Sequence, residues 1–250
     1  MVSPPIIALL ATAGLLGGIS GSVAGLASLV SYPVLLAVGL APVTANVTNT
    51  VALVASSAGS VTGSRPELAG RAGEVRALAV LALAGGVIGA ALLLFTPAAA
   101  FQRVVPLLVG LASMAILLPR RPEITRPRRR RETAPRYIGV FFISIYGGYF
   151  GAGAGVLMLA LMLVTTGQSL ARSNALKNVV LGLANGVAAV GFIVLGRVDW
   201  AAAIPLAVGF LLGGRLGPII VRRAPATLSR LVIAAAGLGL AGYLGLQAYG

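Results

Sequence analysis

Two clusters of glycine and small polar residues interrupt long apolar stretches of this sequence. The first cluster is GGISGSVAG at residues 17–25, and the second is YGGYFGAGAG at residues 146–155. Glycine lets a backbone approach a ligand closely and adopt a positive φ. A helix that breaks inside a membrane frees N–H groups that need partners, and the N-terminus of a half-helix suits an anion. The clusters therefore predict a backbone that binds an anion.

Polar side chains follow each cluster at a similar distance. ANVTN at 45–49 follows the first cluster, and NALKN at 174–178 follows the second cluster. The segment NALKN contains Lys177, the only lysine of the chain. Amide and ammonium groups donate hydrogen bonds to oxyanions. We therefore predict substrate-binding roles for residues of both clusters and both polar segments: Gly18, Ser20, Gly21, Ser22, Asn46, Asn49, Gly148, Gly151, Gly153, Asn174, Lys177 and Asn178. Further donors nearby are Ser28, Ser31, Tyr146 and Tyr149.

These residues also have structural interpretations. Closely spaced glycines serve tight helix packing in membranes, and an asparagine near a helix start is often a cap. Lys177 can be an interfacial charge that sets topology. Arg215, seven residues before Arg222, is expected to extend to the headgroups and not to the substrate. Glycine breaks combined with amides in both halves favour a substrate path.

Residue types that most enzymes depend on are missing or lie away from the apolar segments. The chain has no cysteine and no histidine, which excludes thiolate and imidazole metal sites, cysteine nucleophiles and histidine bases. The acidic residues are all expected in loops: Glu67, Glu74, Glu123, Glu132 and Asp199. An intramembrane enzyme would need a nucleophile or paired acids facing a cavity. We predict no catalytic residue, no metal site and no cofactor.

The elements that must position these residues are transmembrane helices. The 250 residues are 58% hydrophobic and 10% charged, and the mean hydropathy is +1.00. Apolar stretches of about 20 residues recur, which is the length that crosses a hydrocarbon core as a helix. A barrel would instead show short segments of alternating polarity. The N-terminus lacks a basic region and is expected to be a retained part of an all-α, multi-pass membrane protein.

The two halves of the chain match one another in order and spacing, with two small gaps. The matching pairs are SGSVAG at 20–25 with FGAGAG at 150–155, ANVTN with NALKN, and GGVIG at 85–89 with GGRLG at 213–217. We infer an internal duplication.

Each half is expected to open with a broken or re-entrant helical hairpin, at 5–39 and 137–167, followed by three transmembrane helices. Pro33 should interrupt the first hairpin. An odd number of crossings per half makes the two repeats inverted. The predicted organisation is an N-terminal repeat at 1–118, a linker at 119–136 and a C-terminal repeat at 137–250.

The formal charge of +14 is concentrated in the linker. Eight of the nineteen basic residues fall between Arg120 and Arg136, whereas Arg103 and Arg197 are expected on the opposite side of the membrane. Basic loops beside spans record a cytoplasmic position. We therefore expect contact of the linker with anionic lipid headgroups and no nucleic-acid partner. The oligomeric state is left open.

The motifs together resemble the sulfite exporter TauE/SafE family, also called the toluene sulfonate uptake permeases. The resemblance rests on GGISGSVAG with a later proline, YGGYFGAGAG, ANVTN, NALKN, and DW at 199–200 followed by GGRLG, and covers nearly the whole chain. It implies a secondary transporter, working as an exporter, of sulfite, sulfonates or related organic anions across the bacterial inner membrane. The first half departs from the pattern, with Ser22 and Val23 where the second half has Ala152 and Gly153. The alternative is a passive anion channel or a carrier of non-sulfur organic anions.

Overall fold

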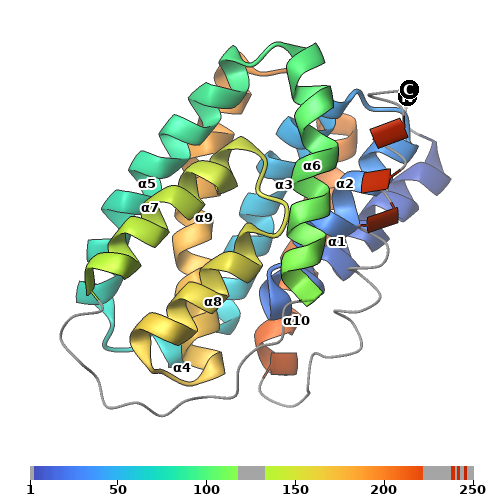
Figure 1. Cartoon of the computed structure of the whole chain (residues 1–250). Coiled ribbons are helices and arrows are strands. Elements are labelled where there is room, and N and C mark those ends of the chain that lie inside the picture. The colour runs from blue at the N-terminus through green and yellow to red at the C-terminus, as the bar shows by residue number, and fades with distance from the viewer. Residues whose placement is uncertain (1–2, 118–132, 222–237, 240, 243–244, 247–250) are drawn as a thin grey trace.

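The chain folds as a bundle of α-helices (Figure 1). The computed structural model describes residues 3–117, 133–221, 238–239, 241–242 and 245–246. Ten helices lie in residues 3–117 and 133–221. Four of them are long and apolar enough to cross a membrane: α1 (Pro4–Ala24), α5 (Ala72–Phe95), α9 (Leu170–Leu195) and α10 (Trp200–Val221). Most of the predicted linker, and most of the predicted last span at 228–248, lie outside the described residues.

The remaining helices complete the predicted order within the described residues. They are α2 (Ala27–Ala37), α3 (Pro42–Gly63), α4 (Arg65–Leu68), α6 (Ala98–Leu117), α7 (Thr133–Tyr149) and α8 (Ala154–Thr166). In the first half, the pair α1 and α2 is followed by the long helices α3, α5 and α6, and in the second half α7 and α8 are followed by α9 and α10.

Local signals explain where several helices begin. Pro4 and Pro42 occupy the first positions of α1 and α3, where the missing N–H is not needed. Ser169 caps α9 by accepting a hydrogen bond from Arg172 N at 3.5 Å. Asp199 accepts one from Ala202 N at 2.9 Å and so caps α10. These caps satisfy N–H groups that have no partner inside the helix.

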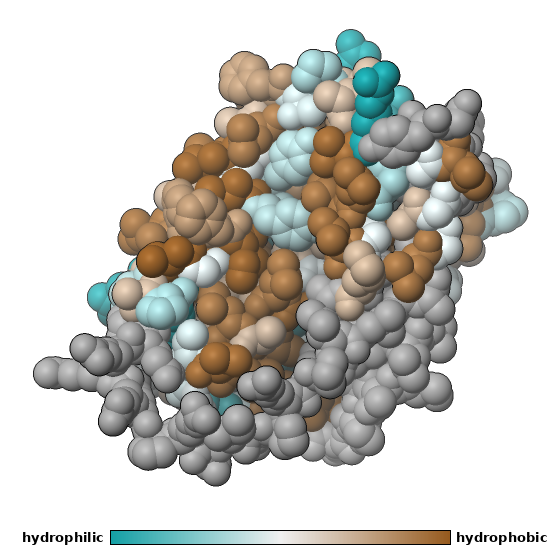
Figure 2. Space-filling model, in the orientation of Figure 1, coloured by the Kyte–Doolittle hydropathy of each residue, from teal (hydrophilic) through white to brown (hydrophobic). Residues whose placement is uncertain are grey.

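The outer surface of the bundle is apolar. Figure 2 shows hydrophobic side chains over most of one face, with hydrophilic residues gathered at its upper edge and lower left. Phe95, Val164 and Leu195 each expose more than 70% of their surface. In contrast, several amides and hydroxyls on α3 and α9 are buried. An exposed apolar surface, with polar side chains turned inward, is the arrangement expected of a protein that faces lipid.

Both opening segments are broken helices, as predicted. The first break falls between α1 and α2, at Gly25 with φ +80°. The second falls between α7 and α8, where Gly151 and Gly153 both have φ +74°. Side chains with a Cβ rarely adopt this left-handed conformation, so glycine permits both reversals. Figure 1 shows α7 rising from the lower left to the middle of the molecule and α8 descending again.

Two details of the predicted breaks were wrong. The first cluster does not interrupt its helix, because α1 continues through Gly17, Gly18 and Gly21 and only Gly25 lies at the break. Pro33 lies inside α2 and does not end it. Proline removes one intrahelical hydrogen bond, and α2 tolerates that loss.

The glycines inside the helices instead allow close packing between the halves. α1 packs along α10, and α5 packs along α7. A Cβ added to Gly18 would lie 2.8 Å from both Gly214 N and Phe210 O, and one added to Gly148 would lie 2.6 Å from Gly86 O. Small residues at such positions let membrane helices approach backbone to backbone.

The helices α3 and α9 connect the two packed pairs. α3 packs against α10 and α9, and α9 packs against α5. Each half therefore places a broken helix against a helix of the other half.

Candidate functional site

The two helix breaks meet in the middle of the bundle. A Cβ added to Gly25 would lie 2.5 Å from Gly155 Cα, and a Cβ added to Gly155 would lie 2.9 Å from Gly25 O. Glycine at both positions is therefore what allows the first break to touch the first turn of α8. Residues 130 positions apart in the chain thus form one junction.

A cavity of about 60 Å³ lies at this junction. Its walls come from both breaks and from α3 and α9: Gly21, Ser22, Gly25, Ala27, Ser28, Leu53, Ser56, Ser57, Ser60, Gly151, Gly155, Lys177, Asn178, Leu181 and Asn185. The cavity is large enough for a few water molecules or one small ligand. Hydroxyl, amide and ammonium groups share its wall with apolar side chains and glycines.

Lys177 brings a positive charge to the cavity from within the membrane-spanning part of α9. The side chain is 1% exposed, and its Nζ donates hydrogen bonds to Gly21 O at 2.9 Å and Ser22 O at 3.3 Å. Both carbonyls belong to the last turns of α1, the negative end of that helix. The ammonium group therefore offsets the negative end of α1 at the cavity wall.

The first turns of two helices point their positive ends at the same cavity. Ala27 and Ser28 lie in the first turn of α2, and Gly155 lies in the first turn of α8. N–H groups in a first turn have no acceptor within their own helix. Lys177 offsets the negative end of α1, and the positive ends of α2 and α8 suit an anion.

Asn178 and Asn49 occupy matching positions in the two repeated segments but differ in their partners. Asn49 Nδ2 donates to Ser28 Oγ at 3.1 Å, and Ser31 Oγ donates to Asn49 Oδ1 at 2.5 Å. Asn178 lines the cavity, and its buried Nδ2 has no partner among the described residues. Because Ser28 Oγ accepts from Asn49, its own proton is left to donate. Asn178 and Ser28 thus add two neutral donors to the cavity wall.

Asn46 and Asn174 hold the broken helices in place. Asn174 Nδ2 donates to Ser22 O, near the end of α1, at 2.6 Å. Asn46 Nδ2 donates to Tyr149 O, at the end of α7, at 2.8 Å. Each asparagine thus satisfies a carbonyl near the end of a broken helix from the other half of the chain. Neither residue lines the cavity, so their contacts are those of positioning residues.

The other predicted residues separate into two groups. Gly21, Ser22 and Gly151 line the cavity with Lys177 and Asn178. The remaining members lie elsewhere: Gly18 and Gly148 at helix contacts, Ser20 with its hydroxyl on Gly17 O, and Gly153 at the start of α8.

Sequence reasoning did not include several residues that line the cavity. Gly25 and Gly155 end their clusters and were treated only as part of the motif. Ser56 and Ser60 lie four residues apart on α3, with Ser57 beside them, and Asn185 lies on α9. Hydroxyls four residues apart share one face of a helix. That spacing was the available signal for the α3 wall.

Acidic side chains are absent from the cavity wall as far as the structure describes it. Glu67 lies on α4 and Glu74 in the first turn of α5, so both are helical where loops were predicted. Glu74 pairs with Arg136 at 3.0 Å and Arg71 at 3.4 Å, and Arg71 also donates to Gln168 Oε1. Asp199 caps α10, whereas Glu123 and Glu132 lie outside the described residues.

A comparison with protein families assigns the chain to a family. The family model described as sulfite exporter TauE/SafE matches residues 10–244. The chain belongs to the TauE/SafE family. The family is one of transporters and not of enzymes, and the chain is a multi-pass membrane protein. A family of sulfite exporters implies a small anionic substrate.

Similar curated proteins carry transporter names. The chain is 28% identical over 223 residues to "Probable membrane transporter protein YfcA" of Escherichia coli K12, covering 88% of this chain and 82% of that protein. It is 24% identical over 234 residues to a "Probable membrane transporter protein" of Haemophilus influenzae, covering 91% and 90%. It is 26% identical over 219 residues to "Probable membrane transporter protein ORF9" of a Sinorhizobium species, covering 85% and 82%. No solved structure matches the chain.

Proposed function

We propose that this TauE/SafE protein is a secondary transporter that exports small sulfur-containing oxyanions, such as sulfite and sulfonates. The observation that carries this proposal is the buried Lys177, held at a cavity where two helix breaks meet. A charge buried at membrane depth is costly, and such residues usually mark a substrate path. A bound oxyanion would neutralise this charge during transport.

We also propose that the two halves are inverted repeats. The contacts between them support this, because α1 packs on α10 as α7 packs on α5, and α3 packs on α10 as α9 packs on α5. The hydrogen bonds of Asn46 and Asn174 are reciprocal in the same way. Inverted repeats with broken helices at the substrate site are a common build of secondary transporters.

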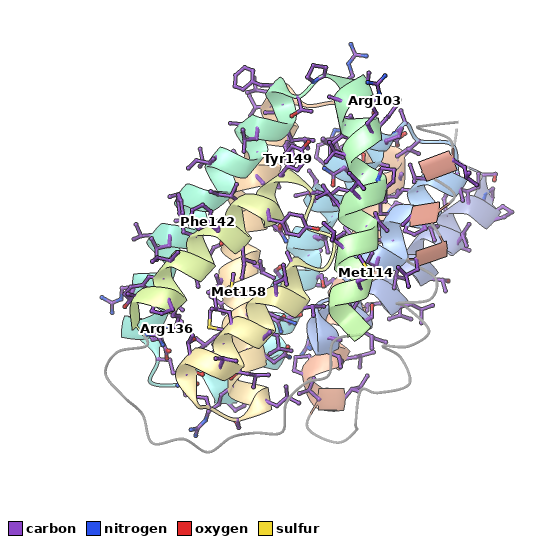
Figure 3. The ribbon with its side chains drawn as sticks, viewed as in Figure 1. Arg103, Met114, Arg136, Phe142, Tyr149 and Met158 are labelled. Atoms are coloured by element: carbon purple, nitrogen blue, oxygen red, sulfur yellow. The ribbon has the colours of Figure 1, made fainter. Side chains whose placement is uncertain are left out.

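The arginines support a cytoplasmic position for the end that contains α4. Figure 3 shows Arg136 at the lower left, near the start of α7, and Arg103 near the top of the molecule. Arg65 begins α4 and Arg71 follows it, on the same side as Arg136, since Arg71 and Arg136 both contact Glu74. An excess of arginine on one side indicates the cytoplasm. The cavity-lining serines of α3 lie toward this end.

The chemistry of the cavity supports a compact oxyanion as substrate. Lys177 supplies the charge, Asn178 and Ser28 supply directed donors, and the first turns of α2 and α8 supply backbone N–H groups. Oxyanions with several acceptor atoms can use such converging donors together. The cavity volume of about 60 Å³ leaves little room for a bulky apolar tail. The proposed binding set is therefore the cavity-lining part of the predicted residues.

Counterflow in proteoliposomes tests the proposed activity. Vesicles preloaded with unlabelled sulfite should accumulate labelled sulfite transiently, and uptake should saturate with concentration. Acetate-loaded vesicles serve as the matched control for a small anion without sulfur. Uptake that never saturates would indicate a channel. Counterflow with acetate but not with sulfite would indicate a carrier of other organic anions, and either result would contradict the proposal.

The variant Asn178→Leu should show whether Asn178 contributes to sulfite binding or to the stability of the fold. We expect Asn178→Leu to weaken sulfite binding about tenfold, the effect of one lost hydrogen bond to a charged ligand. The melting temperature without ligand should be unchanged or raised, since a buried donor without a described partner is removed.

Asn49→Leu is the matched control. Its amide is bonded to Ser28 and Ser31, so we expect a lower melting temperature from the hydroxyls left without their partner. Sulfite titrations and thermal melts of both purified variants check the pair. If Asn178→Leu behaves like Asn49→Leu, with lower stability and unchanged affinity, Asn178 has a structural role only.

A further inference from the structure

Four aromatic rings form a connected cluster beside the second helix break. The rings of Tyr32 and Phe150 are 5.3 Å apart at 87°, and Phe101 lies 5.9 Å from both Phe150 and Tyr149. Tyr32, Phe101 and Phe150 are each no more than 2% exposed. The cluster, which we call the aromatic cluster, joins α2, α6 and the end of α7. Edge-to-face contacts of this kind hold aromatic rings in fixed positions.

The aromatic cluster and the cavity lie at different heights along α3. Tyr32 OH contacts Pro42 O at 3.5 Å and Asn46 Nδ2 bonds Tyr149 O, so the cluster lies beside the first turns of α3. The cavity is lined by Ser56 and Ser60, farther along the same helix. At 1.5 Å per residue, Asn46 and Ser56 are separated by about 15 Å along the axis.

The helix breaks lie between these two levels. On α3, Asn49 lies between the level of the aromatic cluster and the cavity-lining serines. Its amide donates a hydrogen bond to Ser28, which lines the cavity. Phe150 lies within the second break itself, four residues before α8 begins at Ala154. The cavity-lining serines of α3 therefore lie on one side of the breaks, and the aromatic cluster lies on the other side. Figure 1 shows α6, which carries Phe101, crossing in front of α2 and α3 on that side.

We propose that the aromatic cluster is the closed outer gate of the transporter, in a conformation whose cavity is open toward the cytoplasm. This inference rests on the proposed transport function. Phe150 belongs to the same break that contributes Gly151 to the cavity, so a movement that releases the anion outward would also separate the rings. Phe101 and Tyr32 are the parts of the gate on the facing helices α6 and α2. Separation of the rings opens a path along the outer half of α3.

The chain suits a direct test because it contains no cysteine. A single cysteine at the cavity wall, Ser57→Cys, reports access to the cavity when a charged, membrane-impermeant methanethiosulfonate reagent is added. Inside-out vesicles expose the cytoplasmic side to the reagent, and whole cells expose the outer side. We expect modification of Ser57→Cys from the cytoplasmic side to be at least about tenfold faster than from outside.

Removing a gate ring should change this asymmetry. In the Ser57→Cys background, Phe101→Ala and Phe150→Ala should each raise the outer modification rate about tenfold, because the open state becomes more populated. Phe142→Ala is the matched control, since Phe142 lies on α7 and is 62% exposed; it should leave both rates unchanged. Figure 3 shows Phe142 well away from Tyr149 on the same helix.

The cytoplasmic modification rate reports whether each variant keeps its fold. If Phe150→Ala fails to insert, Phe101→Ala on α6 decides the question. Equal rates from both sides in Ser57→Cys alone would overturn the gate. Unchanged outer rates in a gate variant with a normal cytoplasmic rate would also overturn it. The modification rates can be measured without any substrate. If the rates are as expected but sulfite counterflow is absent, the gate proposal is supported and the transport proposal is contradicted.

Discussion

Replacing Lys177 with methionine is expected to weaken sulfite binding by about 10- to 150-fold and to stop transport. The ammonium group is the cation at the cavity, and hydrogen bonds to charged groups contribute about 1.5 to 3 kcal/mol each. The change also restores the negative end of α1, because Gly21 O and Ser22 O lose their shared donor. Titration of the purified variant with sulfite, together with counterflow, measures both effects.

Two further variants separate charge from shape. Lys177→Arg keeps the charge and should retain part of the affinity, although the guanidinium group is larger and planar. Arg215→Met removes a cation from the exposed side of α10 and should leave affinity unchanged. The proposal would fail if Lys177→Met bound sulfite as tightly as the parent protein, or if Arg215→Met lost as much affinity as Lys177→Met.

The sequence predicted the broken helices because their causes are local. A chain with glycine at three of five positions, as in GAGAG at 151–155, cannot maintain a regular helix easily, and Gly151 and Gly153 adopt positive φ there. The first cluster behaves differently, since Gly17, Gly18 and Gly21 face α2 or α10 and remain helical. Composition alone cannot separate these two uses of glycine, because the partner helix that decides between them is remote in sequence.

The predicted site residues show the same division between local and remote causes. Asn49 and Asn178 match in the sequence repeat, yet only Asn49 has serines opposite it on the preceding helix. By offset, Met158 and Leu161 stand where the first half has Ser28 and Ser31. Comparing these segments would have indicated that Asn178 lacks the local partners of Asn49. The carbonyl partners of Asn46 and Asn174, on the other half of the chain, had no such signal.

Lys177 illustrates why packing and binding need not be alternatives at this site. Its contacts with Gly21 O and Ser22 O stabilise the end of α1, which is a structural role. The same contacts hold the ammonium group at the cavity wall and offset a helix end that would repel an anion. The structural interaction therefore determines the electrostatics of the proposed binding site, and both depend on the two breaks staying in contact.

The contact between the breaks leads to the second large effect that we expect. Gly155→Ala should lower the melting temperature by about 5 to 10 °C and abolish sulfite binding. An added Cβ would overlap the backbone of Gly25, and inserting a methyl group into such a contact typically costs about 1 to 3 kcal/mol. Neither backbone can move aside without shifting the first turns of α2 and α8, which line the cavity.

Gly186→Ala provides the matched control for this effect. Gly186 lies on α9, and a Cβ built there meets no atom within 4 Å. The same chemical change should therefore leave stability unchanged or slightly raised, because alanine favours a helix over glycine by about 1 kcal/mol. Melts and sulfite titrations of both variants decide the matter. If Gly155→Ala melts and binds like Gly186→Ala, the breaks do not need to touch, and the anion site cannot depend on their contact.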